Sequence, residues 1–335
     1  ELTITSNYQN LNSKNHTIFM KKSIISKGEI SYKIPNQRNI IRSDIELNPR
    51  GIYRFQNCEM RPLKITISKE GKGNLKQLDK SNLFKKLGRK IKMVNVCKPF
   101  SGDLEKENRA LLKEYYIYQI VSLLTPYALN SRLVKIRYQN PDVSLYLNSY
   151  AILLEPEKSL RKRCKMRKEP SFWVSFSDDS DEFSRELSDY DAAGESYSPN
   201  ENISSKLNFE LINQFIGNGD YELIDRHNTI SMVSQTEEVF FAPYDFDSSD
   251  IINGERFQQQ LFKQWISEQK AENRTLLFTL IKKIISKKEQ ISMLISNSIL
   301  DDQGRKEMIF WLNQAVQTLE KSLSDSHLDG DLKTP

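Results

Sequence analysis

A block of segregated charge, residues 158–202, limits the fold of this chain more than any other feature. Residues 158–170 hold seven basic side chains and one acid, and residues 171–202 hold nine acids and one base. A segment this polar cannot bury enough apolar surface to form a core. We therefore interpret residues 165–203 as a flexible insertion and expect one folded region on each side of it.

The region before the insertion is predicted to be rich in β-strands. Apolar and polar residues alternate at 30–34 and 63–67, as in strands with one buried face. Further strands are expected at 90–98, 133–138 and 149–154. A helical period interrupts them at 105–124, where one stripe holds Ala110, Ile117, Val121 and Leu124.

The region after the insertion is predicted to be mostly helical. A helix is expected at 207–216, followed by a loop and a strand pair at 229–233 and 239–242. Two amphipathic helices are expected at 275–286 and 305–323. The sequence thus predicts an α+β chain with the following division: residues 1–155 as a β-rich lobe, 156–204 as a charged linker, 205–325 as a helical lobe and 326–335 as a disordered tail.

Composition excludes several classes of function. With 49 basic and 44 acidic side chains in 335 residues, the net charge of +5 is too small to indicate nucleic-acid binding. No apolar run approaches the roughly 20 residues that a membrane-spanning helix needs. The three histidines are too few for a His-rich metal site.

Four acids lie in apolar or constrained settings: Glu114, Asp220, Asp245 and Asp247. A buried carboxylate is costly unless it is paired, hydrogen-bonded or bound to a cation. For Glu114, which falls on the apolar stripe of its helix, Lys92 is the first candidate partner, because it alternates in phase with two valines. Lys90 and Lys98 are the second and third candidates. The alternative is a partly exposed Glu114 whose stem covers apolar surface.

Asp220 begins an ordered set of polar residues. Asn228 comes eight residues after it and Asp245 seventeen residues after Asn228. A loop Asp, an Asn, a hairpin and a second Asp form the layout of a protein-kinase-like site. There the first Asp orients or deprotonates the acceptor hydroxyl, and the Asn and second Asp hold Mg²⁺. The alternative is a cluster of Asx turns that only caps the backbone.

Several stretches resemble an uncharacterised family of bacterial, often exported, proteins. Two of them carry the most specific motifs: GNGDYELIDRHNTISM (217–232) and VFFAPYDFDSSDIIN (239–253). The resemblance continues upstream over four more stretches: RGIYRFQNCEMRPLKI (50–65), KIKMVNVCK (90–98), LLKEYYIYQIVSLLTPYALNSRLVKIRY (111–138) and AILLEPEKSLRKR (151–163). That family is in turn similar to CotH-like kinases and, more remotely, to HipA-like kinases.

The resemblance implies a two-lobed atypical kinase that uses Mg²⁺ and ATP. Its β-rich N-lobe would carry one helix and its C-lobe would be mostly α-helical. It implies the following roles: Lys92 for the nucleotide phosphates, Glu114 as the partner of Lys92, Asp220 as the catalytic aspartate, Asn228 and Asp245 as metal ligands, and Asp247 as an accessory ligand. The phosphate acceptor would be a protein or another hydroxyl compound.

Two departures from the kinase pattern bear on these roles. The gap from Asp220 to Asn228 is eight residues, against about five in the kinase catalytic loop, and Asp225 is a rival acid within it. The β-rich lobe also has no Gly-rich phosphate loop. Lys92 alone, or Arg50 or Arg54, would then hold the phosphates, or nucleotide would not bind. The alternative function is a pseudokinase-like binding or cell-envelope interaction module without catalysis.

Cys58 and Cys97 occupy the cysteine positions of the resembling family. In an exported protein they would pair; otherwise they are two buried free thiols. The family resemblance and a first residue other than Met favour an extracytoplasmic location, periplasmic or secreted, with a cytoplasmic location as the alternative.

Overall fold

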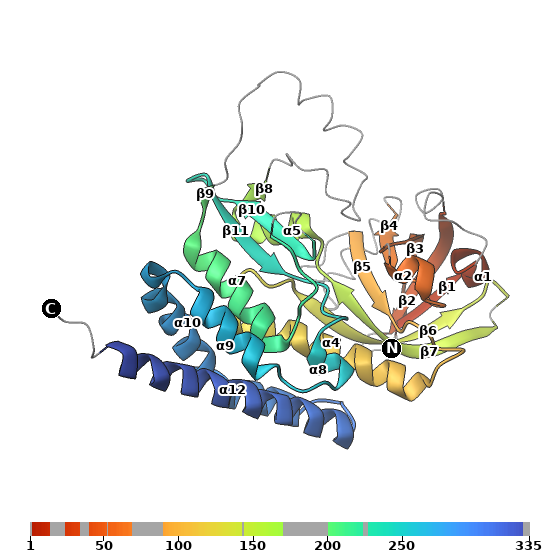
Figure 1. Ribbon diagram of the computed structural model, residues 1–335. Helices are drawn as coiled ribbons and strands as arrows, with labels where there is room; N and C mark the ends of the chain where they lie inside the picture. The colour runs from red at the N-terminus through yellow and green to blue at the C-terminus, as the bar shows by residue number, and fades with distance from the viewer. Residues whose placement is uncertain are drawn as a thin grey trace. The chain divides into compact units, whose positions relative to one another are not determined.

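The computed structural model divides the chain into two compact units (Figure 1). It describes residues 2–13, 24–33, 40–51, 53–68, 90–142, 144–169, 200–223 and 227–330. The first unit holds the described residues of Glu1–Leu111 and Leu129–Arg163; the second holds those of Leu112–Ala128, Cys164–Ser175 and Glu195–Pro335. A sheet-rich N-terminal region and a mostly helical C-terminal region are as predicted.

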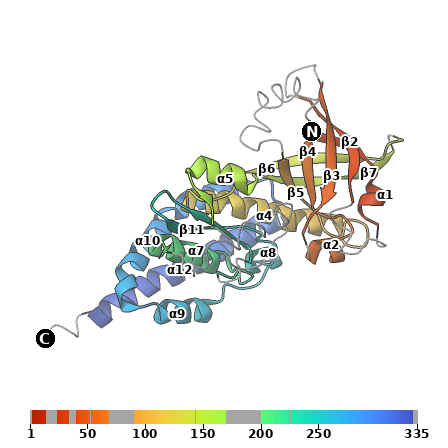
Figure 2. The ribbon, with the colours of Figure 1, turned by 90° about the horizontal axis from the view of Figure 1, so that it is seen from above.

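A closed barrel of seven strands forms the first unit (Figure 2). In barrel order the strands are β1 (Leu2–Ser6), β2 (Ser26–Lys33), β3 (Ile40–Pro49), β4 (Leu63–Ile67), β5 (Lys90–Asn95), β7 (Leu145–Leu154) and β6 (Ser131–Gln139). Parallel pairing of β1 with β6, with Leu2 opposite Ile136, closes the barrel. Alternate residues of β1, β3 and β4 are buried, so one face of each strand fills the core.

A buried polar network links β5 and β6 inside this barrel. The Tyr138 hydroxyl donates to Asn95 Oδ1 at 2.7 Å, and Asn95 Nδ2 donates to the Arg61 carbonyl at 2.7 Å. Burial raises the pKa of Tyr138, so the hydroxyl keeps its proton and acts as a donor. The Arg61 guanidinium lies over the Phe55 ring at 3.8 Å. The two hydrogen bonds satisfy the Tyr138 hydroxyl and the Asn95 amide, which would otherwise be costly to bury.

The first unit contains more helix than the single one expected. Besides the first turns of α4 (Leu104–Leu124) it has α1 (Tyr8–Leu11), α2 (Tyr53–Asn57) and most of α5 (Glu157–Cys164), which lies in the predicted linker. A disulfide joins Cys58, directly after α2, to Cys97, just after β5. Cys164 is a free thiol. The residues alone left open whether Cys58 and Cys97 pair, and in the structure they do.

A sheet of four strands forms the β portion of the second unit. The strand order is β8 (Arg167–Lys168), β10 (Thr229–Val233), β11 (Glu238–Pro243) and β9 (Asn200–Glu201). β8 pairs with β10, and β9 pairs in parallel with β11. The two ends of the 165–203 segment, expected to be flexible, are thus held in the sheet by backbone hydrogen bonds. Residues 170–199 lie outside the described residues.

Helix α7 (Ile203–Ile216) packs against this sheet through one apolar cluster (Figure 1). The cluster contains Phe209, Val233, Val239 and Phe241. The helix begins at the Asn202 cap, whose side chain accepts from the Ser205 amide at 2.9 Å, and it ends at a left-handed Gly217. The end of α7 places the loop that follows it.

The remaining helices are α8 (Asp250–Asn253), α9 (Gln259–Glu268), the short 3-10 helix η2 (Ala271–Asn273), α10 (Arg274–Ser286), α11 (Lys288–Ser296) and α12 (Asp302–Gly330). α10 packs against α7 and α12, and α12 also contacts α9 (Figure 2). The helix of α12 continues to Gly330, into the tail for which we expected disorder. Among the described helices, none combines the length and apolar character that crossing a bilayer requires.

We expect reduction of the Cys58–Cys97 disulfide to destabilise the first unit by about 3–4 kcal/mol, because the bond closes a loop of 39 residues in the unfolded chain. The check is urea unfolding with and without reductant. Cys164→Ser is the control and should leave the midpoint unchanged. Titration of the untreated, denatured protein should find one thiol per chain; three thiols would contradict the disulfide.

We expect Gly217→Ala to destabilise the second unit by about 2–4 kcal/mol. Its φ is +66°, and an added Cβ would lie 2.6 Å from the Trp311 ring. Gly219→Ala is the matched control, because a Cβ there meets nothing within 4 Å, and its effect should stay below about 1 kcal/mol. Chemical denaturation measures both, and equal effects would show that the fit at Gly217 is unimportant.

Candidate functional site

The β10–β11 hairpin brings two of the predicted metal ligands to one end of the sheet. Thr229, the first residue of β10, lies opposite Pro243, the last residue of β11. Asn228 directly precedes β10, and Asp245 lies two residues beyond β11. The two therefore lie at the same end of the hairpin, one residue out of cross-strand alignment.

Both residues adopt a left-handed backbone conformation. The φ of Asn228 is +47° and that of Asp245 is +60°. Asn and Asp tolerate this region better than other residues with a Cβ, yet it still costs free energy. Two such residues at one hairpin end mark a place where the backbone is strained in the folded state, as is frequent at functional sites.

Asp220 is joined directly to Asn228. The Asn228 Nδ2 donates to the Asp220 backbone carbonyl at 2.7 Å and to Asp220 Oδ2 at 3.0 Å. An amide nitrogen has two hydrogens, so both are used. Asn228 is buried, and its Oδ1 accepts no hydrogen bond from any residue in the described part of the chain. Asp220 therefore fixes the orientation of the Asn228 amide.

A local turn absorbs the eight-residue gap between Asp220 and Asn228. The Glu222 amide donates to the His227 carbonyl at 3.0 Å, and the Thr229 hydroxyl donates to the Glu222 carbonyl at 3.1 Å. These bonds return the chain to Asp220 despite the longer loop. The rival acid, Asp225, lies outside the described residues.

The Asp220 carboxylate is open to solvent. Its side chain is 45% exposed, and Oδ1 lies 3.0 Å from His227 Nε2, on a ring that is itself 58% exposed. The backbone amide of Asp220 donates to Asn218 Oδ1 at 3.3 Å. An accessible carboxylate, held by its backbone and by two side chains, is able to meet an acceptor hydroxyl.

Phe246 explains why two acids bracket an aromatic residue. Its side chain is fully buried and packs on the Tyr118 ring at a centroid distance of 4.8 Å. The Tyr118 hydroxyl accepts the Asp245 amide hydrogen at 3.2 Å. Glu114 is buried one turn before Tyr118 on α4, hence on the same helix face. Phe246 thus anchors the segment, and Asp245 and Asp247 flank this anchor.

The other predicted acid of this segment is half-buried. The Ser248 hydroxyl donates to Asp247 Oδ1 at 3.4 Å, in the turn that follows Phe246. The Ser249 hydroxyl donates to the Phe246 carbonyl at 2.6 Å and closes that turn. Asp247 is therefore near Asp245 in sequence but is held by a separate local turn.

One backbone bond ties the two motif segments together. The Asp250 amide, at the start of α8, donates to the Gly217 carbonyl at 2.9 Å. The Trp311 indole donates to the Phe215 carbonyl at 2.9 Å, near the end of α7. The loop carrying Asp220 is thus fixed to the segment carrying the later acids.

Lys92 lies in the first unit and is buried, as its phase with Val94 and Val96 predicted. Its ammonium forms an ion pair with Glu157 Oε1 at 2.7 Å, a partner that the sequence analysis missed. Lys90 is exposed at the end of the same strand. Since Glu114 belongs to the second unit, the predicted pair of Lys92 with Glu114 stays a prediction.

The ligand chemistry at the hairpin end suits Mg²⁺. Within the described residues, no group of three or more His, Cys, Asp or Glu side chains is arranged to hold a metal ion. Mg²⁺ does not require such a cage, because it is held by one or two protein carboxylates with water and substrate phosphates. The Asn228 amide oxygen and the Asp245 carboxylate are hard oxygen donors of this kind, so the residues fit the ion.

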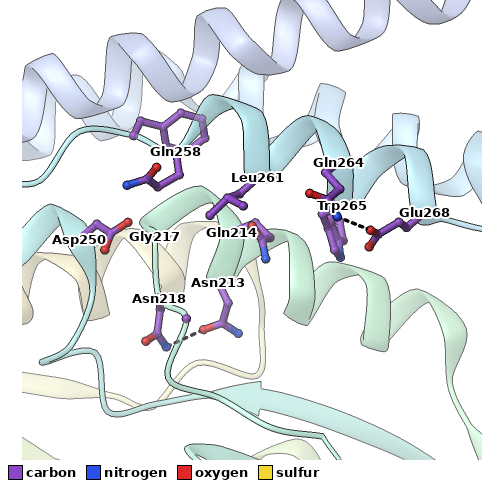
Figure 3. Close-up of a pocket in the computed structure, with 12 residues that line it drawn as sticks. Asn213, Gln214, Gly217, Asn218, Asp250, Gln258, Leu261, Gln264, Trp265 and Glu268 are labelled. Atoms are coloured by element: carbon purple, nitrogen blue, oxygen red, sulfur yellow. Dashed lines mark hydrogen bonds between the residues drawn. The ribbon is translucent and has the colours of Figure 1, made fainter.

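A pocket of about 570 Å³ opens beside the Asp220 loop (Figure 3). Its described lining comes from α7 and the loop after it, from α8, and from α9 with the residues before it. These are Asn213, Gln214, Gly217, Asn218, Gly219, Asp250, Phe257, Gln258, Leu261, Gln264, Trp265 and Glu268. The sequence analysis predicted no pocket here, because its walls come from residues distant in the chain.

Charge in and behind this pocket is mainly negative. Burial and the neighbouring Glu255 raise the pKa of Asp250. Burial also raises the pKa of Glu210, against the opposing effects of Lys206 and of a hydrogen bond from Trp265. That hydrogen bond joins the pocket indole to a carboxylate behind it. Burial is the main cause of both raised pKa values, and a like charge, Glu255 for Asp250, is the lesser cause.

Lys113 is a further buried charge that sequence reasoning missed. It pairs with Glu307 at 2.5 Å, and its ammonium also lies within 3.4 Å of the Ile251 and Ile252 carbonyls. This cation joins α4, α8 and α12 within the second unit. In the sequence, the only indication that Lys113 would be buried was its position next to Glu114.

Comparisons with protein-family models and with curated proteins find no match. Among solved structures, the crystal structure of a Helicobacter pylori proinflammatory kinase, CtkA, is similar to this chain. The identity is 11% and the TM-score 0.40, over 73% of this chain and 88% of that one. We draw no inference from a likeness this distant.

We expect Asn228→Ala to be less stable than Asn228→Gly by about 1–2 kcal/mol. Both variants lose the amide bonds to Asp220, but only Ala places a Cβ on a backbone with φ of +47°. Urea denaturation of the two variants and the parent measures the difference. Equal stability of Ala and Gly would show that the left-handed conformation at Asn228 costs nothing.

Proposed function

We propose that this chain is an atypical, Mg²⁺-dependent kinase that transfers phosphate from ATP to a hydroxyl of a protein or another acceptor. The observation that carries the proposal is the joining of Asp220 to Asn228 at the hairpin end that also carries Asp245. This gives one solvent-accessible carboxylate, one oriented amide oxygen and one further carboxylate in a single loop cluster. Phosphoryl transfer needs positioning and charge neutralisation, which such a set supplies.

In the proposed reaction, Asp220 orients the acceptor hydroxyl and takes its proton. The hydroxyl oxygen forms a bond to the γ-phosphorus while the bond from that phosphorus to the β,γ-bridging oxygen breaks. The products are ADP and a phosphate monoester, and the proton on Asp220 passes to water. The hydrogen bond from Asn228 to Oδ2 orients the Asp220 carboxylate for this role.

Asn228 and Asp245 would hold Mg²⁺, with Asp247 as an accessory ligand. When bound, the ion neutralises charge on the nucleotide phosphates. In the first unit, Lys92 would bind a phosphate and Glu114 would be its partner. No Gly-rich loop precedes Lys92, so the phosphate contacts would come from the ammonium itself.

A binding module without catalysis is the second candidate, and one observation favours it. The Lys92 ammonium already lies 2.7 Å from Glu157, and Arg161 also pairs with Glu157 at 3.5 Å. The Lys92 charge is thus already compensated by Glu157, which is not the partner that the kinase arrangement requires. Under this alternative the fold persists, but labelling of an acceptor is absent.

An oxidising compartment is part of the proposal. The Cys58–Cys97 disulfide is of a kind that forms and persists outside the reducing cytoplasm. This supports the expectation of a periplasmic or secreted protein. Fractionation of the native host, with the thiol titration described above, tests it.

We expect ATP with Mg²⁺ to raise the melting temperature by about 5–10 °C at a nucleotide concentration about 100-fold above its Kd. The shift should require both components, so ATP alone and Mg²⁺ alone are the controls. Asp245→Asn should abolish the Mg²⁺-dependent part and Asp220→Asn should keep it. Differential scanning fluorimetry measures the shifts.

Transfer of label from γ-³²P-ATP to the chain itself, to casein or to histone then separates the two candidates. Asp220→Asn should lower labelling by about 10²- to 10⁴-fold, the usual contribution of a general base. A thermal shift without labelling would favour the binding module. Equal labelling by the parent and both variants would refute the assignment of these residues.

A further inference from the structure

We propose that the pocket beside Asp220 binds a cationic side chain, Lys or Arg, of a polypeptide and so selects a basic acceptor segment. This inference rests on the proposed kinase function, and it assigns the acceptor class for the same site. Three features of the second unit support it: the charge of the pocket, the kind of polar group in its walls and its position relative to Asp220.

The charged side chains of the pocket disfavour anionic ligands and favour cations. Its described lining contains two carboxylates, Asp250 and Glu268, and no Lys, Arg or His. Glu268 lies on exposed helix surface, where its Oε1 accepts from the Gln264 amide at 2.8 Å (Figure 3). The neighbouring cation, Lys206, pairs with Glu201 at 2.7 Å and is not part of the described lining. A phosphate in this pocket would meet like charge, whereas an ammonium or guanidinium would be stabilised.

The walls of the pocket suit a peptide rather than a free cation. Three glutamines of the described lining, Gln214, Gln258 and Gln264, are at least partly exposed, whereas Asn213 and Asn218 are buried and hydrogen-bonded to each other. Amide side chains both donate and accept, as a peptide backbone requires. The half-buried Trp265 indole offers an aromatic face for a cation, and Leu261, which is 59% exposed, offers apolar contact for a methylene stem. A volume of about 570 Å³ is within the range of ligand pockets.

The position of the pocket connects it to the catalytic residue. Gly219, at its rim, directly precedes Asp220, and the buried Asn218 in its wall accepts the Asp220 amide hydrogen at 3.3 Å. Adjacent residues of an extended peptide are about 3.5 Å apart along the chain. Under the proposal, a basic residue in the pocket would bring a nearby Ser or Thr of the same segment to the Asp220 carboxylate.

The test uses three fluorescent peptides that contain one Ser and differ only in the two residues before it: Arg-Arg, Gln-Gln or Glu-Glu. Fluorescence anisotropy with the whole chain should show the Arg-Arg peptide binding at least about tenfold more tightly than the Gln-Gln peptide, and the Glu-Glu peptide binding weakest. Binding of the Arg-Arg peptide should weaken as salt is added, since ion pairs at an open pocket are screened.

Two variants place this selectivity in the pocket. Glu268→Gln and Asp250→Asn should each lower affinity for the Arg-Arg peptide about fivefold or more and leave that for the Gln-Gln peptide unchanged. Glu272→Gln is the matched control: its carboxyl is 74% exposed on η2 and is not in the described lining, and the substitution removes the same charge. It should bind like the parent. Thermal unfolding of all three variants checks that they fold.

Equal binding of the three peptides, or parent-like binding by both pocket variants, would overturn the inference. A third outcome would also overturn it. In that outcome the peptides do not bind, whereas a neutral oligosaccharide such as maltotriose binds and Trp265→Leu removes that binding. These results are separate from a failure of the proposed function, because the thermal shift with ATP and Mg²⁺ does not involve the peptides. A nucleotide-binding, labelling-competent chain without basic preference would retain the kinase proposal and lose this one.

Discussion

The candidate site depends on one hydrogen-bonded pair, the Asn228 amide on Asp220. The pair connects the loop after α7 to the residue that precedes the hairpin. It therefore fixes the positions of Asp220 and Asn228 relative to each other, although they are eight residues apart. It also orients the amide of Asn228: the nitrogen donates to Asp220, and the oxygen accepts no hydrogen bond from the residues that the structure describes. Without this pair, Asp220 would be an exposed acid on a loop and Asn228 a strained residue with no evident purpose.

Much of the secondary structure follows from local patterns. The helix at 104–124 and the hairpin at 229–243 were predicted within about two residues, since an amphipathic period and a pair of apolar runs are local signals. Closure of the barrel was not predicted. It depends on the pairing of Leu2 with Ile136, and a period in the sequence carries no record of which distant strand lies alongside.

The candidate site was likewise predicted where the signal is local and missed where it depends on distant residues. Asp220, Asn228 and Asp245 were identified as one ordered set, and the hairpin register explains why Asn228 and Asp245 lie at the same end of the hairpin. Glu157 as the partner of Lys92 was missed, because α5 follows the barrel strands and its position depends on tertiary packing. The pocket was missed for a similar reason: α9 reaches the end of α7 only through the helical packing of the second unit.

The backbone at Asp245 decides how any loss of activity there should be interpreted. With a φ of +60°, an alanine would add the cost of a left-handed Cβ to the loss of a carboxylate. Asparagine tolerates that conformation and keeps the size of the side chain, so Asp245→Asn removes only the charge. A defect shared by Ala and Asn therefore reports on the carboxylate, whereas a defect confined to Ala reports on the turn beside Phe246. Only the first outcome bears on metal binding, and the same reasoning applies to Asn228, where Gly is the variant free of strain.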